Sequence, residues 1–154
     1  MQRRTLFMFS CKNLAYILTM LEAIEKIFYY TDAFFDEDEF FNANKQLNFN
    51  ATVNLLIAIG EENKKIDDGL KTSNDINWNN ISAMRDKISH NYRGIDEGLV
   101  WDIVKNYLPT LKVLLVDMLE KIEDSEVYIN EAVSSKYYED LKYLATENKK
   151  DELA

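Results

Sequence analysis

The residues best suited to chemistry lie close together in residues 84–92, which contain Arg85, His90 and Tyr92. His90 is the single histidine of the chain. Histidine is the one side chain whose unperturbed pKa lies near neutrality, and arginine stays cationic throughout the physiological range. A histidine close to an arginine therefore indicates proton transfer at a phosphate. A histidine satisfied by core packing is an equal alternative at this point.

A helix through these residues separates the two alternatives. With Ile81, Met84 and Ile88 as its buried stripe, Arg85 flanks the stripe and His90 falls about 160° from its centre. His90 then faces away from the monomer core, which leaves a surface, interface or catalytic role. Residues five apart are separated by about 140° on an ideal helix, so Arg85 and His90 do not share a face. If they act together, either the helix loosens near His90 or a second copy supplies its own pair across a two-fold axis.

The composition of the 154-residue chain predicts one all-α domain spanning residues 1–154. Apolar residues make up 47% of it, and only 4 glycines and 1 proline are present to form turns, which favours long helices. No run of about 18 apolar residues occurs, so we expect no membrane-spanning helix. The net charge of -9 argues against broad electrostatic binding to nucleic acid, so any RNA contact must be local.

The cysteine and histidine content limits the metal chemistry. One cysteine, Cys11, cannot form an internal disulfide, and together with one histidine it cannot supply a four-ligand zinc site from a single chain. No cluster of metal ligands is visible in the sequence, and we expect no metal site and no cofactor, although carboxylates dispersed in the sequence could still meet in space. A reducing, cytoplasmic location is consistent with both observations.

Apolar residues at helical spacing predict the elements before the motif. A first long helix covers residues 13–30, a short helical turn falls within 36–43, and a second long helix covers about 48–70. Phe40 is expected to fold back on the core. Gly60 lies in the middle of the second long helix, where glycine costs about 1 kcal/mol relative to alanine. We therefore expect close helix packing at Gly60.

The motif itself lies on the third long helix. A polar loop at 72–75 precedes this helix, and Asn79 or Asn80 is its expected N-cap. The helix is expected to end near Gly94. The motif is therefore placed on a regular element and not on a loop.

Two further helices complete the chain. Asp96 is the expected N-cap of a long fourth helix, and Pro109 within its pattern predicts a kink or a short break near Tyr107. A fifth helix is expected at 126–146, with its apolar face packed on the bundle or on a partner. Because most connections are short, the predicted architecture is an up-and-down antiparallel bundle of four core helices plus a C-terminal helix.

Residues 85–92, Arg-Asp-Lys-Ile-Ser-His-Asn-Tyr, resemble the R-x4-H-x-Y motif of HepT-like toxins, a branch of the HEPN ribonuclease superfamily. Three other segments are similar to that family in order and spacing, and the similarity covers residues 12–119. These segments are 16–27, 54–61 and 95–104. The chain departs from the pattern at Asp86, where many HEPN ribonucleases carry asparagine, and in the helix after Ser125, which extends beyond the shared core.

This resemblance implies a HEPN-like bundle that cleaves RNA without a metal ion, with the two motifs of a homodimer facing each other in a cleft. It implies that Arg85 and His90 are catalytic. His90 would act as general base or acid on a ribose 2′-hydroxyl or leaving oxygen, and Arg85 would neutralise the pentacovalent phosphate. The expected product is a 2′,3′-cyclic phosphate.

The resemblance also implies a partner. HepT-like toxins belong to type II toxin-antitoxin systems whose antitoxin resembles a minimal nucleotidyltransferase, which in some systems adds AMP to the motif tyrosine. That residue is Tyr92 here, and added phosphate would place bulk and negative charge where RNA must enter. The alternative for Tyr92 is a ring packed beside Ile88 and Met84.

The remaining motif residues have supporting roles. Asp86 is a candidate motif-supporting residue, and Lys87 and Arg93 are either solvated charges or a local positive rim that contacts RNA. Two other functions compete with the ribonuclease: a non-catalytic helical dimer that binds a nucleotidyltransferase partner, and a nucleotide-binding helper subunit of a transferase. Cleavage of RNA in the presence of EDTA, dependent on Arg85 and His90, separates the enzyme from both.

Overall fold

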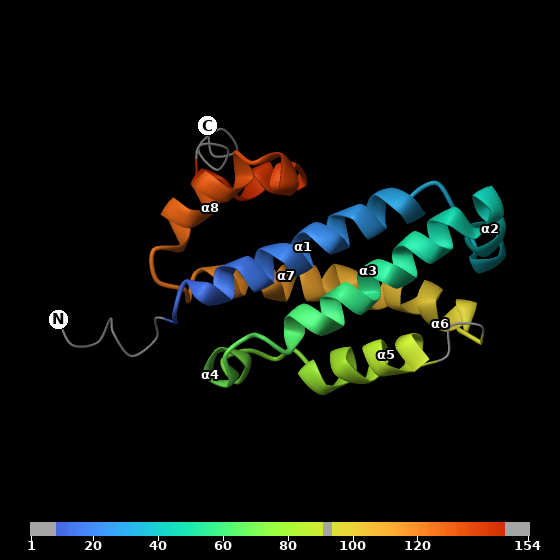
Figure 1. Cartoon of the computed structure of the whole chain (residues 1–154), viewed down its shortest axis with the longest axis horizontal. Coiled ribbons are helices and arrows are strands. Elements are labelled where there is room, and N and C mark those ends of the chain that lie inside the picture. The colour runs from blue at the N-terminus through green and yellow to red at the C-terminus, as the bar shows by residue number, and fades with distance from the viewer. Residues whose placement is uncertain (1–8, 91–93, 147–154) are drawn as a thin grey trace.

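The computed structural model of the chain describes residues 9–90 and 94–146, and the described chain is a bundle of antiparallel helices (Figure 1). Four long helical segments run alternately up and down, as the composition and short connections predict. They are α1 (Lys12–Thr31), α3 (Leu47–Asn63), α5 (Trp78–His90) and the run formed by α6 (Glu97–Asp102), η2 (Ile103–Tyr107) and α7 (Leu108–Leu119). None of the helices in the described ranges is both long enough and apolar enough to span a membrane.

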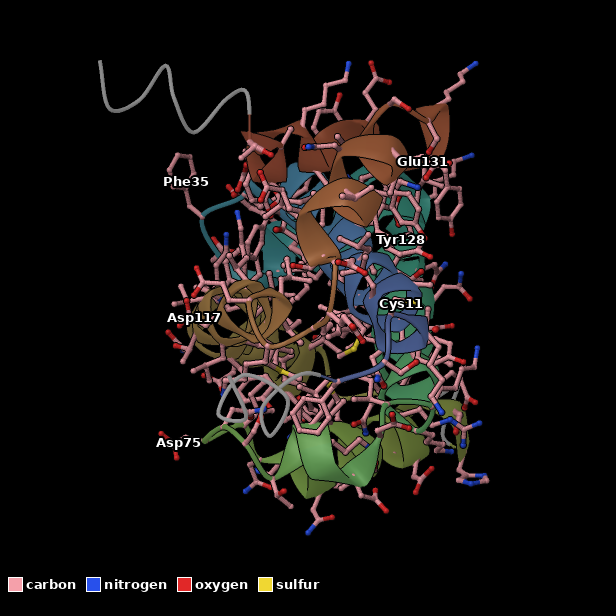
Figure 2. The ribbon with its side chains drawn as sticks, turned by 90° about the vertical axis from the view of Figure 1, so that its left-hand side faces the viewer. Cys11, Phe35, Asp75, Asp117, Tyr128 and Glu131 are labelled. Carbon is pink, nitrogen blue, oxygen red and sulfur yellow. The ribbon has the colours of Figure 1, made fainter. Side chains whose placement is uncertain are left out.

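The core forms around α1, which lies against both α3 and α7. Its apolar side chains recur every three to four residues and are buried: Leu14, Ile17, Leu18, Leu21, Ile24 and Ile27. The short helix α2 (Glu37–Asn42) closes one end of this core by inserting Phe40, whose ring lies 5.7 Å from Phe49 and 5.6 Å from Trp101. Phe40 thus folds back on the core as expected. Phe35, in contrast, stands out into solvent beside α2 (Figure 2).

The second long helix ends earlier than the sequence pattern predicts. We expected it to run to residue 70, but α3 ends at Asn63 and the chain turns before the separate short helix α4 (Asp68–Lys71). The buried amide of Asn13 explains the turn, since its Oδ1 accepts a hydrogen bond from Asp67 N at 2.9 Å and its Nδ2 donates one to Asp67 Oδ2 at 3.0 Å. These long-range bonds satisfy the buried amide of Asn13, which would lose both of them if α3 continued through residue 67.

The motif helix α5 begins with a different cap from the one we expected. The Oδ1 atom of Asn77, not of Asn79 or Asn80, accepts a hydrogen bond from the backbone of the first turn, at 3.1 Å from Asn80 N. The described part of α5 ends at His90. The expected end near Gly94 cannot be compared, because residues 91–93 lie outside the described residues.

The fourth helical run follows the sequence prediction closely. Asp96 caps it by accepting a hydrogen bond from Leu99 N at 3.1 Å. Pro109 occupies the first turn of α7, and the preceding residues Ile103–Tyr107 widen into a π-helical turn. Proline has no N–H to donate to the preceding turn, so the local widening near Tyr107 is the expected response.

The C-terminal segment is two helices instead of the single helix expected at 126–146. Helix α8 (Ser125–Val133) stops at Ser134, and the 3-10 helix η3 (Lys136–Leu144) follows. The four side chains that face the bundle are nevertheless buried: Ile129, Val133, Leu141 and Leu144. The segment is tied to α1 by a 3.2 Å hydrogen bond from the Tyr143 hydroxyl to Glu25. Of the two possibilities predicted for its apolar face, the bundle or a partner, the structure shows packing on the bundle.

Candidate functional site

Helix α5 places the motif at the edge of the bundle, in contact with α3 on one side. Ile81, Met84 and Ile88 form its buried stripe, as predicted. This stripe determines the direction of all the remaining side chains of α5, because the angle of a residue from the stripe determines whether it faces α3, α6 or solvent. The stripe therefore determines where Arg85 and His90 point.

Arg85 lies against α3, where Gly60 makes room for it. A methyl group built on Gly60 would lie 2.6 Å from Arg85 Cγ and closer still to Cβ, so only glycine permits this approach. The close helix packing expected at Gly60 is confirmed, and the residue that it accommodates is the motif arginine. The aliphatic part of Arg85 is thus fixed by backbone, while its guanidinium extends further along α3.

Two carboxylates bind the Arg85 guanidinium. Its Nε atom forms an ion pair with Glu61 Oε1 on α3, and its Nη1 atom lies 3.0 Å from Asp86 Oδ1 on α5. The hydrogen bond to Asp86 and the negative charge of Glu61 raise the pKa of Arg85 above its usual value. Within the described residues no partner binds Nη2. Arg85 is therefore a fixed cation with N–H groups left to donate, which suits a phosphate oxygen.

His90 is the last described residue of α5 and is exposed to solvent. The prediction that His90 faces away from the core is confirmed, and the alternative that it packs in the core is wrong. No hydrogen bond or ion pair joins it to Arg85 in the described chain. One chain thus presents the arginine on the α3 side of the helix and the histidine on another side, as the five-residue spacing predicts.

The other candidate residues are only partly placed. Asp86 is exposed and touches Arg85, which fits a motif-supporting residue. Lys87 lies on the opposite flank of α5 from Arg85 and lines an open groove with Leu99 of α6 and Tyr107 of η2. Tyr92 and Arg93 lie outside the described residues, so the structure does not place either of them.

Glu61 is the residue of this site that the sequence analysis did not identify. It lies within a segment similar to a known family, but its own role could not be assigned from that similarity. The available signal was its position directly after a mid-helix glycine, because a glycine that admits a close neighbour also brings the next residue near it. Elsewhere in residues 9–90 and 94–146, no three histidine, cysteine, aspartate or glutamate side chains are grouped so as to hold a metal ion.

Comparison with known families gives one match over most of the chain. The sequence model described as "Ribonuclease HepT-like" matches residues 20–118, which include Gly60, Glu61, Arg85 and His90. No solved structure matches the chain significantly.

Several curated proteins are similar to the chain. A Methanocaldococcus jannaschii protein named "Gamma-glutamylcyclotransferase and putative RNase" is 33% identical over 72% of this chain and 49% of its own length. A second protein of that organism, named "Putative RNase", is 30% identical over 73% of this chain and 91% of its own length. The Thermococcus cleftensis protein named "Probable ribonuclease HepT" is 38% identical over 40% of this chain and 57% of its own length. The chain thus spans about half the length of the first and third of these relatives.

Proposed function

The chain belongs to the HepT-like ribonuclease family, and on this premise we propose that it is a metal-independent endoribonuclease whose site is completed across a homodimer. The observation that carries the proposal is the arrangement of Arg85 and His90 on α5. Arg85 is held against α3 with N–H groups left to donate, while His90 is exposed on another side of the same helix. An anchored cation and an accessible imidazole are the two groups that phosphodiester cleavage without a metal requires.

The reaction follows from these two groups. The imidazole of His90 accepts the proton of a ribose 2′-hydroxyl, and the resulting oxygen attacks the adjacent phosphorus. The bond from phosphorus to the 5′-oxygen of the next nucleotide breaks, and that oxygen takes up a proton. The products are a 2′,3′-cyclic phosphate and a 5′-hydroxyl. Arg85 stabilises the charge that develops on the pentacovalent phosphate, which is the largest contribution such a site can make.

The dimer supplies what one chain lacks. The side of α5 opposite its buried stripe is exposed, and Ala83, Asp86 and His90 lie on it. A second copy packed on this face across a two-fold axis would bring each His90 toward the Arg85 of the other chain. Two imidazoles in one cleft also allow one to act as base and the other as acid. Lys87 and Arg93 would then contribute local positive charge along the RNA path.

We further propose that the protein is the toxin of a two-component system. The support is the family membership together with the motif tyrosine at position 92. In this proposal an antitoxin of the nucleotidyltransferase type joins the Tyr92 phenol oxygen to the α-phosphorus of ATP. Pyrophosphate leaves and the phenol proton is lost to solvent. The added AMP places negative charge two residues from His90 and blocks the entry of RNA phosphates.

Cleavage of RNA by the purified chain in EDTA tests the proposal. The parent should cut a single-stranded RNA to fragments ending in cyclic phosphate, and the Arg85→Ala and His90→Ala variants should cut at least about 100-fold more slowly. Lys136→Ala is the matched control, because it removes an exposed positive charge on η3, far from the motif in sequence. If His90→Ala cuts as well as the parent, or the parent cuts nothing, the non-catalytic dimer becomes the better description.

A further inference from the structure

The two carboxylates on Arg85 differ in how firmly they are held. We propose that Glu61 of α3 positions the Arg85 guanidinium for catalysis, and that the RNA phosphate replaces Asp86, not Glu61, on that guanidinium. This inference rests on the proposed ribonuclease function, since it assigns Arg85 to the phosphate. It goes beyond that function by naming a positioning residue outside the motif and by separating the roles of two acidic residues.

Burial distinguishes the two contacts. The Oε1 atom of Glu61 and the Nε atom of Arg85 are both shielded from solvent where they meet. The Asp86 side chain is 56% exposed, against 42% for Glu61 and 25% for Arg85. Breaking the Glu61 contact would separate two atoms that water does not reach, whereas the Asp86 carboxylate can turn into water at little cost.

Gly60 and its neighbour Glu61 together restrict the orientation of the Arg85 side chain. Gly60 receives the Cβ and Cγ atoms of Arg85, and the next residue along α3 binds its Nε. The arginine is therefore held at both ends of its flexible stem by two consecutive residues of one rigid helix. A long side chain held at two points has few rotamers left, so the guanidinium reaches the substrate already oriented.

The geometry of the guanidinium predicts which edge meets the phosphate. Its Nε is occupied by Glu61, its Nη1 by Asp86, and no described residue binds Nη2. A phosphate binds an arginine best through two parallel N–H groups. The Nη1–Nη2 edge offers such a pair once Asp86 turns away, while the Nε edge is closed by Glu61. The phosphate thus takes the place of Asp86.

The inference predicts opposite effects for the same chemical change. Replacing either carboxylate with its amide removes one negative charge near the phosphate, which by itself favours RNA binding. For Asp86→Asn the loss of charge is the main effect. Two unit charges at contact distance in water interact by roughly 1 kcal/mol, which corresponds to a factor of about five, so RNA binding should tighten by about fivefold. For Glu61→Gln the loss of orientation should dominate, and kcat should fall by about 10- to 100-fold with little change in KM.

The test uses the full chain and an RNA oligonucleotide of mixed sequence that carries a fluorophore and a quencher, with the 2′-O-methyl oligonucleotide for affinity. Glu62→Gln is the matched control, because it removes a carboxylate of α3 that pairs with Lys65 and not with Arg85. Glu62→Gln should match the parent, and thermal unfolding shows whether each variant is folded. Glu61→Asp keeps the charge on a shorter stem, so its kcat should lie between those of the parent and Glu61→Gln. If Glu61→Gln does not fold, the kcat of Glu61→Asp is compared with those of the parent and Asp86→Asn instead.

The outcomes separate this inference from the proposed function. If Arg85→Ala is inactive while Glu61→Gln cuts at the parental rate or faster, Glu61 does not position Arg85 and only the inference fails. If Asp86→Asn loses kcat as Glu61→Gln does, the phosphate does not replace Asp86. If Arg85→Ala cuts like the parent, the proposed function fails and the inference fails with it.

Discussion

Arg85 and His90 leave the same helix in different directions, Arg85 toward α3 and His90 toward solvent. The packing of α5 maintains this separation, since rotating the helix to bring His90 inward would expose Ile81 and Ile88, which are buried. Arg85 is also anchored and cannot follow the histidine. The proposed homodimer accounts for this separation, because it would draw the arginine and the histidine of one site from two chains.

Mixing two inactive variants tests this composite site. Arg85→Ala and His90→Ala should each be inactive alone, but a dimer of one with the other contains one complete site, formed by the intact Arg85 and the intact His90. Equal mixing after co-refolding should recover about a quarter of the parental cleavage rate, because half of the dimers are mixed and each has one site of two. Mixing Arg85→Ala with the double variant should recover nothing. An inactive mixture of the two single variants would place both residues of a site on one chain.

The Gly60→Ala variant tests the approach of Arg85 to α3. Alanine is favoured over glycine within a helix by about 1 kcal/mol. Its methyl group would nevertheless meet Arg85 Cγ at 2.6 Å, so we expect the free energy of unfolding to fall by about 1–3 kcal/mol, together with cleavage activity. Gly94→Ala is the control, because a methyl group there meets no atom within 4 Å. Urea denaturation measures the free energy of unfolding of both variants, and the RNA cleavage assay measures their activity. A more stable Gly60→Ala variant would show that α3 and α5 do not pack as described.

The sequence alone predicts much of this site because most of it depends on local spacing. The stripe of Ile81, Met84 and Ile88 determines the direction of His90 without any knowledge of neighbouring helices. Gly60 predicts close packing for a similarly local reason. The residue that meets Gly60 is determined by the register between α3 and α5, which no spacing within either helix encodes. Glu61 was missed for this reason.

The helix ends were predicted less well for a related reason. The apolar pattern continues past Asn63 to Leu70, so periodicity alone extends the helix. The turn depends on hydrogen bonds between Asn13 and Asp67, which are 54 residues apart. Helix propensity depends on local sequence and carries no information about such a distant contact. The tertiary hydrogen bonds therefore override the propensity.

Leu141 provides a test of whether the C-terminal segment belongs to the folded unit. Its side chain is fully buried on η3, so Leu141→Ala should lower the free energy of unfolding by about 2–5 kcal/mol. Val127→Ala on α8 is the control, because Val127 is exposed and its loss should change stability by less than about 0.5 kcal/mol. Denaturant unfolding of the two variants gives the comparison. Equal stability would show that η3 does not pack on α1 in solution.

The contact between Asn13 and Asp67 predicts a pH dependence of stability. Hydrogen bonds from Asn13 and then from Lys12 hold the pKa of Asp67 below its ordinary value in the folded state. A group with a lowered folded-state pKa stabilises the protein above its unfolded pKa of about 4, and this contribution is lost as the pH falls through the lower folded value. Asp67→Asn should therefore lower the Tm at pH 7, and its Tm should approach that of the parent near about pH 2.

The control for this pH effect is Asp75→Asn, which changes the net charge equally. Asp75 is exposed in the loop before α5 and points away from the chain (Figure 2). Its replacement should leave the Tm close to that of the parent at both pH values, because Asp75 forms no ion pair or side-chain hydrogen bond with any described residue. Scanning calorimetry at a series of pH values measures all three proteins. If the Tm difference between Asp67→Asn and the parent is as large at low pH as at pH 7, the charge of Asp67 does not stabilise the turn after α3.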